Sequence, residues 1–315
     1  MTPSLDIIIV NWNAGALLRR CLTALPGALD PSFVLNRVVV VDNASTDGSL
    51  DGVETVPLPI TVLRNASNRG FGAACNQGAA DSTANYLLFL NPDVYVKRDS
   101  LSAPLAFLGD RRHDDVGVVG IQLRDAQGTV ARSSARIPTP ATIGARILGL
   151  DVLFPQWVPS LFLTDWDHES TQELHHVIGA FYLVRRPLFI SLGGFDERFF
   201  VYLEDLDLSV RIRTLGRRIF FLANVHAEHT GGGTSDAIKA RRMAYSLHSR
   251  IQYGYKHFGR AAGTLLALGT LVVEPGPRLV RAIVRRSLPE LRDTCVGFAL
   301  LWGRVIAGLG VTRSR

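Results

Sequence analysis

The sequence predicts an α/β fold in which helices cover both faces of a doubly wound, mostly parallel sheet. Apolar runs of strand length alternate with helical patterns through the first half of the chain. These runs are apolar almost without interruption, which is typical of strands buried on both faces. The 315 residues, 47% of them hydrophobic, are enough for one large domain with a real core and an appendage.

The expected elements follow one another in order along the chain. Strands are expected at residues 6–11, 37–41, 60–64, 86–90, 116–123, 178–185 and 218–222. Helices are expected at residues 14–25, 73–80 and 203–215. Residues 125–175 contain Pro138, Pro140, Pro155 and Pro159, which break any long element, so we expect irregular loops there.

Basic residues are concentrated near the end of the chain, which suggests the domain organisation. Residues 241–315 carry twelve Arg and one Lys against three acids, whereas the rest of the chain is slightly acidic. An acidic body argues against a nucleic-acid-binding protein, and a basic tail suits an anionic surface. We expect one α/β domain over residues 1–260 and a basic, amphipathic helical tail over residues 261–315.

The tail has two possible structures. Its apolar stretches, 261–273 and 294–310, fall short of the roughly 20 uninterrupted apolar residues of a membrane-spanning helix. Between them, four aliphatic side chains share one helix face and four arginines the other: Leu279, Val280, Ile283, Val284 and Arg278, Arg281, Arg285, Arg286. This pattern predicts a helix on an anionic membrane surface or a helical hairpin packed on the first domain.

The start of the chain and the cysteines indicate the compartment. The segment MTPSLDIIIV lacks the basic region of a secretory signal. Cys21 and Cys75 lie in apolar helical patterns, as expected of buried thiols in a reducing cytosol. We therefore expect a cytoplasmic protein that is peripheral at the inner face of the cell membrane.

Polar clusters follow three of the expected strands: Asn11-Trp12-Asn13, residues 42–47 and Asn91-Pro92-Asp93. Each cluster alone is explained by turn or cap formation. The carboxyl ends of neighbouring parallel strands open into one crevice, however, so three clusters there indicate a binding site. A carboxylate held at Asp93 suits a hard divalent cation that bridges phosphates, or else it caps the next element.

A glycine-containing segment, residues 68–72, precedes the helix expected at 73–80. Its glycines permit close backbone approach, and a helix N-terminus favours negative charge. The pattern is not GxGxxG and follows the third strand, so a dinucleotide site is not expected.

Three acids open the helix expected at residues 203–215. Glu204 and Asp205 continue the apolar stripe of Leu208, Ile212 and Leu215, so both are expected to point inward or into the crevice. Inward-facing acids are costly unless they have a function. Asp207 precedes Arg211 by four residues, and we expect these two to form an ordinary surface ion pair.

Two histidines, His226 and His229, precede the glycine-rich residues 231–235. Either one is a candidate metal ligand beside a loop that closes over phosphates, or an ordinary surface histidine.

Taken together, these segments resemble the family 2 glycosyltransferases of the bacterial rhamnosyltransferase-like group. Any one piece is nonspecific, but the ordered set is highly specific. The matching pieces lie within about residues 5–260: IIIVNWN (7–13), VVVVDNASTDGS (38–49), NRGFGAACNQG (68–78), LLFLNPDV (87–94), GAFYLVRR (179–186), GGFDERFFVYLEDLDLSVRIRTLG (193–216) and HTGGGTS (229–235).

The resemblance implies a GT-A fold and roles for the matching residues. Asp42 would contact the base or ribose of a nucleotide sugar, with Trp12 stacked near the base. Asp93 and His229 would hold Mg²⁺ or Mn²⁺, although the first acid of the family's DxD motif is Asn91 here. Asp205 would be the general base, with Glu204 as a second catalytic acid. The rest of the nucleotide-sugar site would be Asn13, Asp47, Arg69, Asn76 and Asn91.

The resemblance also implies the reaction. It is an inverting sugar transfer from a nucleotide donor, first of all L-rhamnose from dTDP-rhamnose, to a glycan or lipid-linked glycan in cell-envelope polysaccharide synthesis. One alternative is a sugar nucleotidyltransferase, which needs no acceptor base at Glu204 and Asp205. The other is a non-catalytic, membrane-associated sugar-binding scaffold, which would be expected to have lost the acids.

Overall fold

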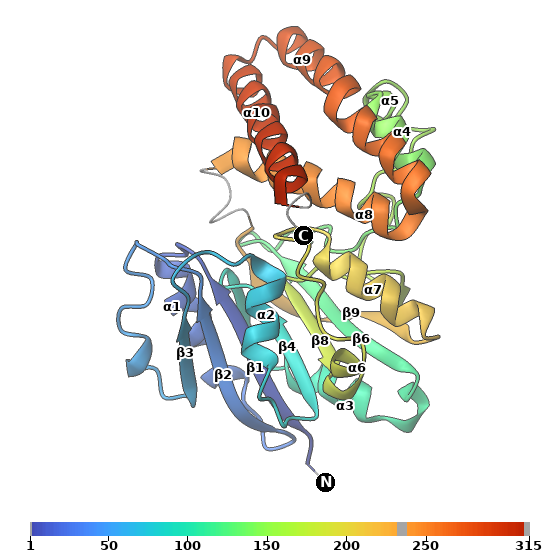
Figure 1. The fold of residues 1–315 in the computed structure, drawn as a ribbon. Coiled ribbons are helices and arrows are strands. Elements are labelled where there is room, and N and C mark those ends of the chain that lie inside the picture. Colours follow the sequence, from blue (N-terminus) through green and yellow to red (C-terminus); the bar gives the residue numbers. More distant parts are fainter. Residues whose placement is uncertain (1, 232–237, 312–315) are drawn as a thin grey trace. The chain divides into compact units, whose positions relative to one another are not determined.

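The computed structural model describes residues 2–231 and 238–311 (Figure 1). Its contacts divide these residues into two compact units. The first unit holds residues 2–137, 162–197 and 204–231, and the second holds residues 138–161, 198–203 and 238–311. The second unit thus takes residues 238–260 as well as the expected tail, and the boundary at residue 260 stays a prediction.

The first unit is built on one sheet of nine described strands in the order β3-β2-β1-β4-β8-β6-β9-β5, with β7 beside β9. Their bounds are β1 Ser4–Asn11, β2 Val34–Asp42, β3 Ile60–Arg64, β4 Tyr86–Leu90, β5 Val94–Val96, β6 Val116–Arg124, β7 Gln172–Leu174, β8 Phe181–Arg185 and β9 Arg218–His229.

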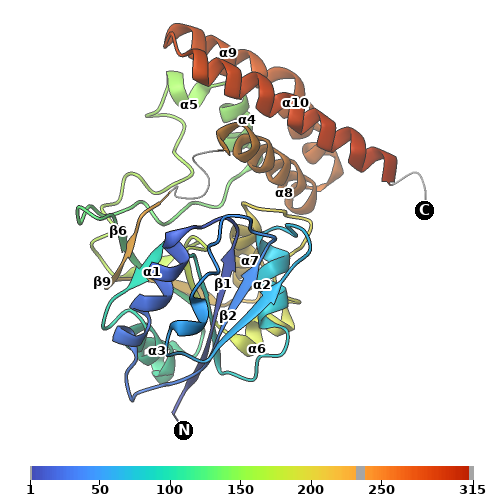
Figure 2. The same cartoon turned by 90° about the vertical axis from the view of Figure 1, so that its left-hand side faces the viewer.

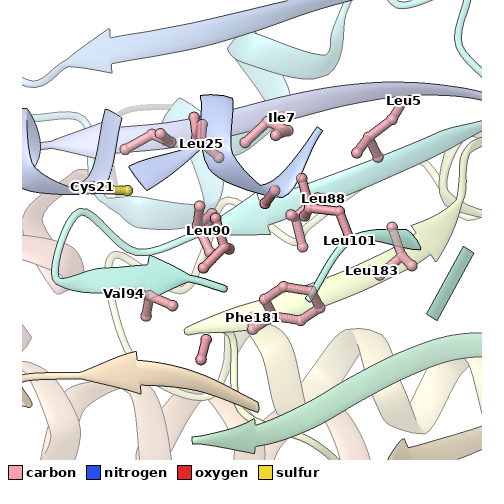
Figure 3. Close-up of a cluster of buried hydrophobic side chains, with 14 of the residues drawn as sticks. Leu5, Ile7, Cys21, Leu25, Leu88, Leu90, Val94, Leu101, Phe181 and Leu183 are labelled. Carbon is pink, nitrogen blue, oxygen red and sulfur yellow. The ribbon is translucent and has the colours of Figure 1, made fainter. Parts of the chain in front are cut away.

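Helices of this unit cover both faces of the sheet, as Figures 1 and 2 show. They are α1 Ala16–Ala24, α2 Phe71–Ala79, α3 Ser102–Gly109, α6 Arg186–Ser191 and α7 Glu204–Thr214. Helices α1 and α3 share one buried cluster with the sheet, and α2, α6 and α7 share the cluster on the opposite face. Figure 3 shows side chains of the first cluster, among them Cys21, Leu25, Ile7, Leu90 and Phe181.

The doubly wound α/β class is confirmed, and the pairing is more mixed than expected. Strand β1 is parallel to β2 and β4, and β2 is parallel to β3. Strand β8 is antiparallel to both β4 and β6. An unbroken apolar run is compatible with a buried strand that is parallel or antiparallel to its neighbours. The sequence pattern therefore does not reveal the direction of β8. The reversal places the start of β8 beside the end of β4.

The second unit is helical and has its own core. Its helices are α4 Pro140–Ile147, α5 Leu150–Leu153, α8 Lys239–Leu268, α9 Pro275–Val284 and α10 Leu288–Val311, with a π-helical turn at Gly269–Val273. Leu247 and Ile251 of α8 pack against Leu271, Phe298 and Leu301. The helix α8 bends at Gly259, whose φ of 79° suits glycine.

Two expectations for the helices need correction. Pro140 does not break structure but begins α4, where a capping box of Thr139 and Thr142 satisfies the first turn. Leu215 is 56% exposed and does not belong to the buried stripe of α7. Arg278 and Arg281 pair with Glu274 and Glu290 at 2.8 and 2.7 Å, and the choice between the two tail structures that the sequence allows stays a prediction. Within residues 2–231 and 238–311, none of the helices combines the length and apolarity needed to cross a membrane.

Candidate active site

The ends of β1, β2 and β4 carry the polar clusters that the sequence singled out, and backbone contacts hold these ends together. The amide of Asn43 donates to the Asn11 carbonyl at 2.8 Å, which continues the β1–β2 register. Strand β4 lies on the other side of β1. The three clusters therefore meet at one edge of the sheet, as the parallel arrangement predicts.

Asp42 is 4% exposed at the end of β2. One carboxylate oxygen accepts a hydrogen bond from the Asn11 side chain at 2.7 Å, and the other accepts one from the Ser45 amide at 3.1 Å. A carboxylate has about four acceptor positions, so two remain for a ligand. Its predicted contact with a base or ribose stays a prediction that this geometry permits.

Asp47 and Asn13 fasten the loops that follow β1 and β2. Asp47 accepts hydrogen bonds from the amides of Gly15 and Ser49 at 2.7 and 3.1 Å, and Asn13 accepts one from Thr46 at 2.8 Å. Partial burial of Asp47 opposes ionisation, but the bonds from Ser49 and Gly15 outweigh it and lower its pKa. Both side chains therefore hold the loops after β1 and β2 in place, and their contacts with a nucleotide stay predictions.

The remaining predicted nucleotide residues occupy different settings. Asn76 is engaged on both sides of its amide by the loop before α7: it donates to the Phe195 carbonyl at 2.9 Å and accepts from the Phe195 amide at 2.8 Å. Arg69 is exposed and Trp12 half-buried. Asn76 thus has a structural role in this fold, and a nucleotide contact would have to be additional to it.

Asn43 lies at the same edge of the sheet, and the sequence did not single it out as a site residue. It is 2% exposed, donates to the Gly70 carbonyl at 3.1 Å and accepts from the Asn65 side chain at 2.9 Å. These bonds fix the segment before α2 against the end of β2. Its position directly after Asp42 was the available signal.

The start of β8 joins the Asn91-Pro92-Asp93 segment to the acids of α7. The Asn91 amide donates to the Ala180 carbonyl at 2.9 Å. The neighbouring Gly179 amide donates to a carboxylate oxygen of Asp205 at 2.7 Å. Gly179 and Ala180, which are consecutive, thus connect the segment with the predicted metal ligand to the helix with the predicted general base. This contact depends on the reversed direction of β8.

Asp93 and His229 face each other across β5 and β9. Val94 pairs with His229 in the antiparallel register, and the Thr230 amide donates to the Asp93 carbonyl at 3.1 Å. This arrangement leaves the His229 Nε2 and an Asp93 carboxylate oxygen 3.4 Å apart. One carboxylate and one imidazole suit a divalent cation that takes further oxygens from phosphates and water. Among the residues described, no group of three or more His, Cys, Asp or Glu could hold a metal by itself.

The two histidines of β9 have different surroundings. His226 is exposed and pairs in register with Gln122 of β6, whereas His229 lies opposite Val94 and contacts Asp93. The position of His229 therefore suits a ligand role better. Most of the glycine-rich segment expected to close over phosphates, residues 232–235, lies outside the described residues.

The acids at the start of α7 differ in exposure. Glu204 is 5% exposed and one of its carboxyl oxygens has no hydrogen-bond partner, whereas the Asp205 side chain is 18% exposed. Burial, reinforced by the charge of Asp205, raises the pKa of Glu204 well above its ordinary value. Glu204 is therefore the buried acid whose protonated form is favoured, and Asp205 is the acid that reaches the surface of the site.

Asp207 is buried, which corrects the expected surface ion pair. It is 0% exposed, and Arg211 donates to it at 2.8 Å. Arg211 also donates to the carbonyls of Leu192 and Gly194 at 2.9 and 2.8 Å. The spacing of four residues correctly predicted the pair, but not its environment.

The raised pKa of Glu204 predicts a pH-dependent loss of stability. The folded chain retains this proton at pH values where the unfolded chain has released it, so the free energy of unfolding falls as pH rises above the ordinary Glu range. Glu204→Gln, which mimics the protonated acid, should raise the midpoint of thermal unfolding at pH 8 and leave it nearly unchanged at pH 4. Glu169→Gln, at an exposed position, is the control and should not change the midpoint at either pH. An equal change of the midpoint at both pH values would mean that the pKa of Glu204 does not differ between the folded and unfolded chain.

A family model described as "Glycosyl transferase family 2" matches residues 6–193, more than half of the chain. The chain belongs to this family. As a family 2 glycosyltransferase it is an enzyme, and the two alternatives of a nucleotidyltransferase and a non-catalytic scaffold are set aside.

Relatives of this glycosyltransferase include rhamnosyltransferases. It is 27% identical over 307 residues to the N-acetylglucosaminyl-diphospho-decaprenol L-rhamnosyltransferase of Mycobacterium tuberculosis, covering 91% of this chain and 96% of the relative. It is 26% identical over 172 residues to rhamnosyltransferase WbbL of Escherichia coli, covering 54% of this chain and 61% of that protein.

Solved structures of glycosyltransferases share the fold. The mannosyltransferase PcManGT of Pyrobaculum calidifontis, solved with GDP-Man and Mn²⁺, superposes with a TM-score of 0.55 at 21% identity. The match covers 95% of this chain and 81% of that chain. The expected GT-A fold is therefore confirmed.

Proposed function

We propose that this glycosyltransferase transfers L-rhamnose from dTDP-rhamnose, with inversion, to a lipid-linked glycan in the synthesis of a cell-envelope polysaccharide. The observation that carries the proposal is the likeness to a decaprenol-linked rhamnosyltransferase over nearly the full length of both chains. The site agrees chemically, because it presents one accessible acid and a separate Asp–His pair at one edge of the sheet.

Asp205 acts as the general base in this proposal. The Gly179 amide fixes one of its oxygens, and its own helix fixes the other through the Leu206 amide at 2.8 Å. Held in this way, the carboxylate takes the proton of the acceptor hydroxyl as that oxygen attacks the anomeric carbon. Attack from the face opposite the nucleotide inverts the anomeric configuration. The burial that raises the pKa of Glu204 disfavours a second negative charge beside the base.

Asp93 and His229 would hold Mg²⁺ or Mn²⁺ in this proposal, together with oxygen ligands from the donor's phosphates. When bound, the cation supplies positive charge that offsets the charge developing on the departing nucleoside diphosphate. The chain's own contribution is the fixed separation of these two side chains, which the β5–β9 register maintains.

A donor screen followed by a transfer assay tests the proposed function. The midpoint of thermal unfolding is measured with dTDP-, UDP- and GDP-sugars, each with and without Mn²⁺. We expect dTDP-rhamnose with Mn²⁺ to give the largest increase, since a ligand at 100 times its Kd adds about 2.7 kcal/mol to stability. With N-acetylglucosaminyl-diphospho-polyprenol added, dTDP should then be released. Stabilisation by another donor alone contradicts the donor assignment, and binding without release contradicts the acceptor.

The partner of the second unit is, in this proposal, the cytoplasmic surface of the cell membrane. Exposed apolar side chains follow one another at helical spacing along the end of α8, the π-turn and α9: Leu265, Leu268, Val272, Val280, Ile283 and Val284, each at least 55% exposed. Arg285, 61% exposed, borders them. An apolar stripe bordered by arginines matches an anionic bilayer surface, where a lipid-linked acceptor resides.

Vesicle flotation tests this partner. We expect wild-type protein to float with vesicles of anionic lipid more than with zwitterionic ones, and the triple variant Val280→Ser, Ile283→Ser, Val284→Ser to stay behind. Three serine substitutions at exposed apolar sites of the first unit, Leu29, Val34 and Ile190, are the matched control. Flotation unchanged in the α9 variant, or a change only in oligomeric state, rules out the membrane assignment. Surface substitutions are preferable to deleting residues 261–315, because that deletion removes Phe298 and Leu301 from the core.

A further inference from the structure

Three buried polar side chains stand behind Asp205, and the proposed reaction does not use them. His176 lies in the segment between β7 and β8, Tyr182 lies in β8 and Ser209 lies in α7. Their exposed fractions are 3%, 0% and 0%. Burying polar groups is costly unless each is satisfied, so their common placement behind one acid requires an explanation.

The three side chains form a continuous chain of contacts that ends at Asp205. The Tyr182 hydroxyl is 3.1 Å from the Ser209 hydroxyl, and the Ser209 hydroxyl is 2.9 Å from His176 Nδ1. His176 Nε2 faces the Asp205 carboxylate at 3.7 Å. Ser209 follows Asp205 by one helical turn, so the imidazole spans two side chains of the same helix face.

A carboxylate acting as the general base at Asp205, as the proposed reaction requires, favours one direction for the hydrogens of this chain. His176 Nε2 and the Asp205 carboxylate are too far apart, at 3.7 Å, for a hydrogen bond, but in the tautomer with its proton on Nε2 the N–H dipole points at the carboxylate and Nδ1 accepts from the Ser209 hydroxyl. Ser209 then has only acceptor capacity left, which the Tyr182 hydroxyl fills. All donors therefore point toward the base. Burial lowers the pKa of His176, although the charge of Asp205 partly opposes this, so the neutral imidazole that the chain requires is the favoured form.

We propose that His176 is a positioning residue for the general base: with Ser209 fixing its tautomer, it directs an N–H dipole at Asp205 and holds the carboxylate ready for the acceptor hydroxyl. The inference rests on the proposed role of Asp205. A neutral dipole orients the carboxylate without the large loss of basicity that a neighbouring cation would cause. Catalytic carboxylates depend on such support, because misplacement by about 1 Å can cost about 100-fold in rate.

Steady-state kinetics of four variants test this role. His176→Phe keeps a ring of similar size but removes both nitrogens, and we expect kcat to fall about 10- to 100-fold while the KM for the donor and the Kd for dTDP change less than about threefold. His176→Gln, which retains one donor and one acceptor, should recover part of that loss. Ser209→Ala should lower kcat less than His176→Phe, and Tyr182→Phe should lower it least, because each lies further from Asp205.

A double-mutant cycle separates this inference from the assignment of the base. If His176 acts through Asp205, adding His176→Phe to Asp205→Asn should have no further effect on residual activity. Losses that add in full, or equal losses in kcat, donor affinity and thermal stability with no recovery in His176→Gln, would show that the ring only packs. Full activity of Asp205→Asn would instead overturn the proposed base itself. Loss in Asp205→Asn with wild-type kcat in His176→Phe would overturn the positioning role alone.

Discussion

Asp205→Asn should reduce sugar transfer by about 100- to 10,000-fold while leaving donor binding intact, the range expected for loss of a general base. Asparagine retains the size of the side chain and one acceptor oxygen, but it cannot take the proton of the acceptor hydroxyl. The measurements are dTDP release in the presence of acceptor and the change in unfolding midpoint caused by dTDP-rhamnose. The release of dTDP should be lost, whereas the midpoint shift caused by dTDP-rhamnose should remain.

Two comparisons keep this result specific to the base. Asp205 accepts from both Gly179 and Leu206, and asparagine can serve only one of these amides, so the stability of the variant must be measured as well. Exposed Asp81→Asn changes the net charge equally and should keep wild-type activity. Substantial transfer by well-folded Asp205→Asn would require another proton acceptor.

Arg211→Ala should have the largest effect on stability, lowering the free energy of unfolding by about 3–5 kcal/mol, as is usual when one partner of a buried ion pair is removed. The variant removes the Arg211 guanidinium from Asp207, which is 0% exposed. It also removes the donors to the carbonyls of Leu192 and Gly194. The measurement is chemical denaturation, with the midpoint and slope compared to wild type.

An exposed ion pair provides the control for this prediction. Arg112 pairs with Asp110 at 2.5 Å, but the Arg112 side chain is 83% exposed. Arg112→Ala should therefore leave the denaturation midpoint almost unchanged, because water screens the pair and replaces the lost bonds. Similar small effects in both variants would contradict the burial of Asp207 and restore the surface pair that the sequence suggests.

Much of the fold was predictable because its signals are local. The unbroken apolar runs at residues 6–11, 37–41 and 86–90 correspond to β1, β2 and β4, and their parallel pairing followed from burial on both faces. Short β5 and β7, three residues each, carry too few side chains for a recognisable period. The direction of β8 left no trace in its composition, although that direction brings Gly179 to Asp205.

In the candidate site, too, some features could be predicted from local sequence and others depend on tertiary packing. Asp42, Asp93 and Asp205 could be selected because strand ends and helix starts place them by local rules, and the ordered motifs connected them to one family. Local spacing also paired Asp207 with Arg211, but it could not reveal that the pair is buried. His176 could not be linked to Asp205 in advance, because 29 residues separate them and only the packing of the β7–β8 segment on α7 brings them together.

The sequence by itself determined the α/β class, the family and the set of acids, because these depend on hydrophobic period, turn chemistry and motif order. Only the tertiary structure decided which acid is buried with a raised pKa, which acid is accessible, and which side chains support the accessible one. The physical reason is that desolvation and hydrogen bonding depend on neighbours distant in the chain. Glu204 and Asp205 are adjacent in sequence, yet one lies in the protein interior and the other faces solvent and the Gly179 amide.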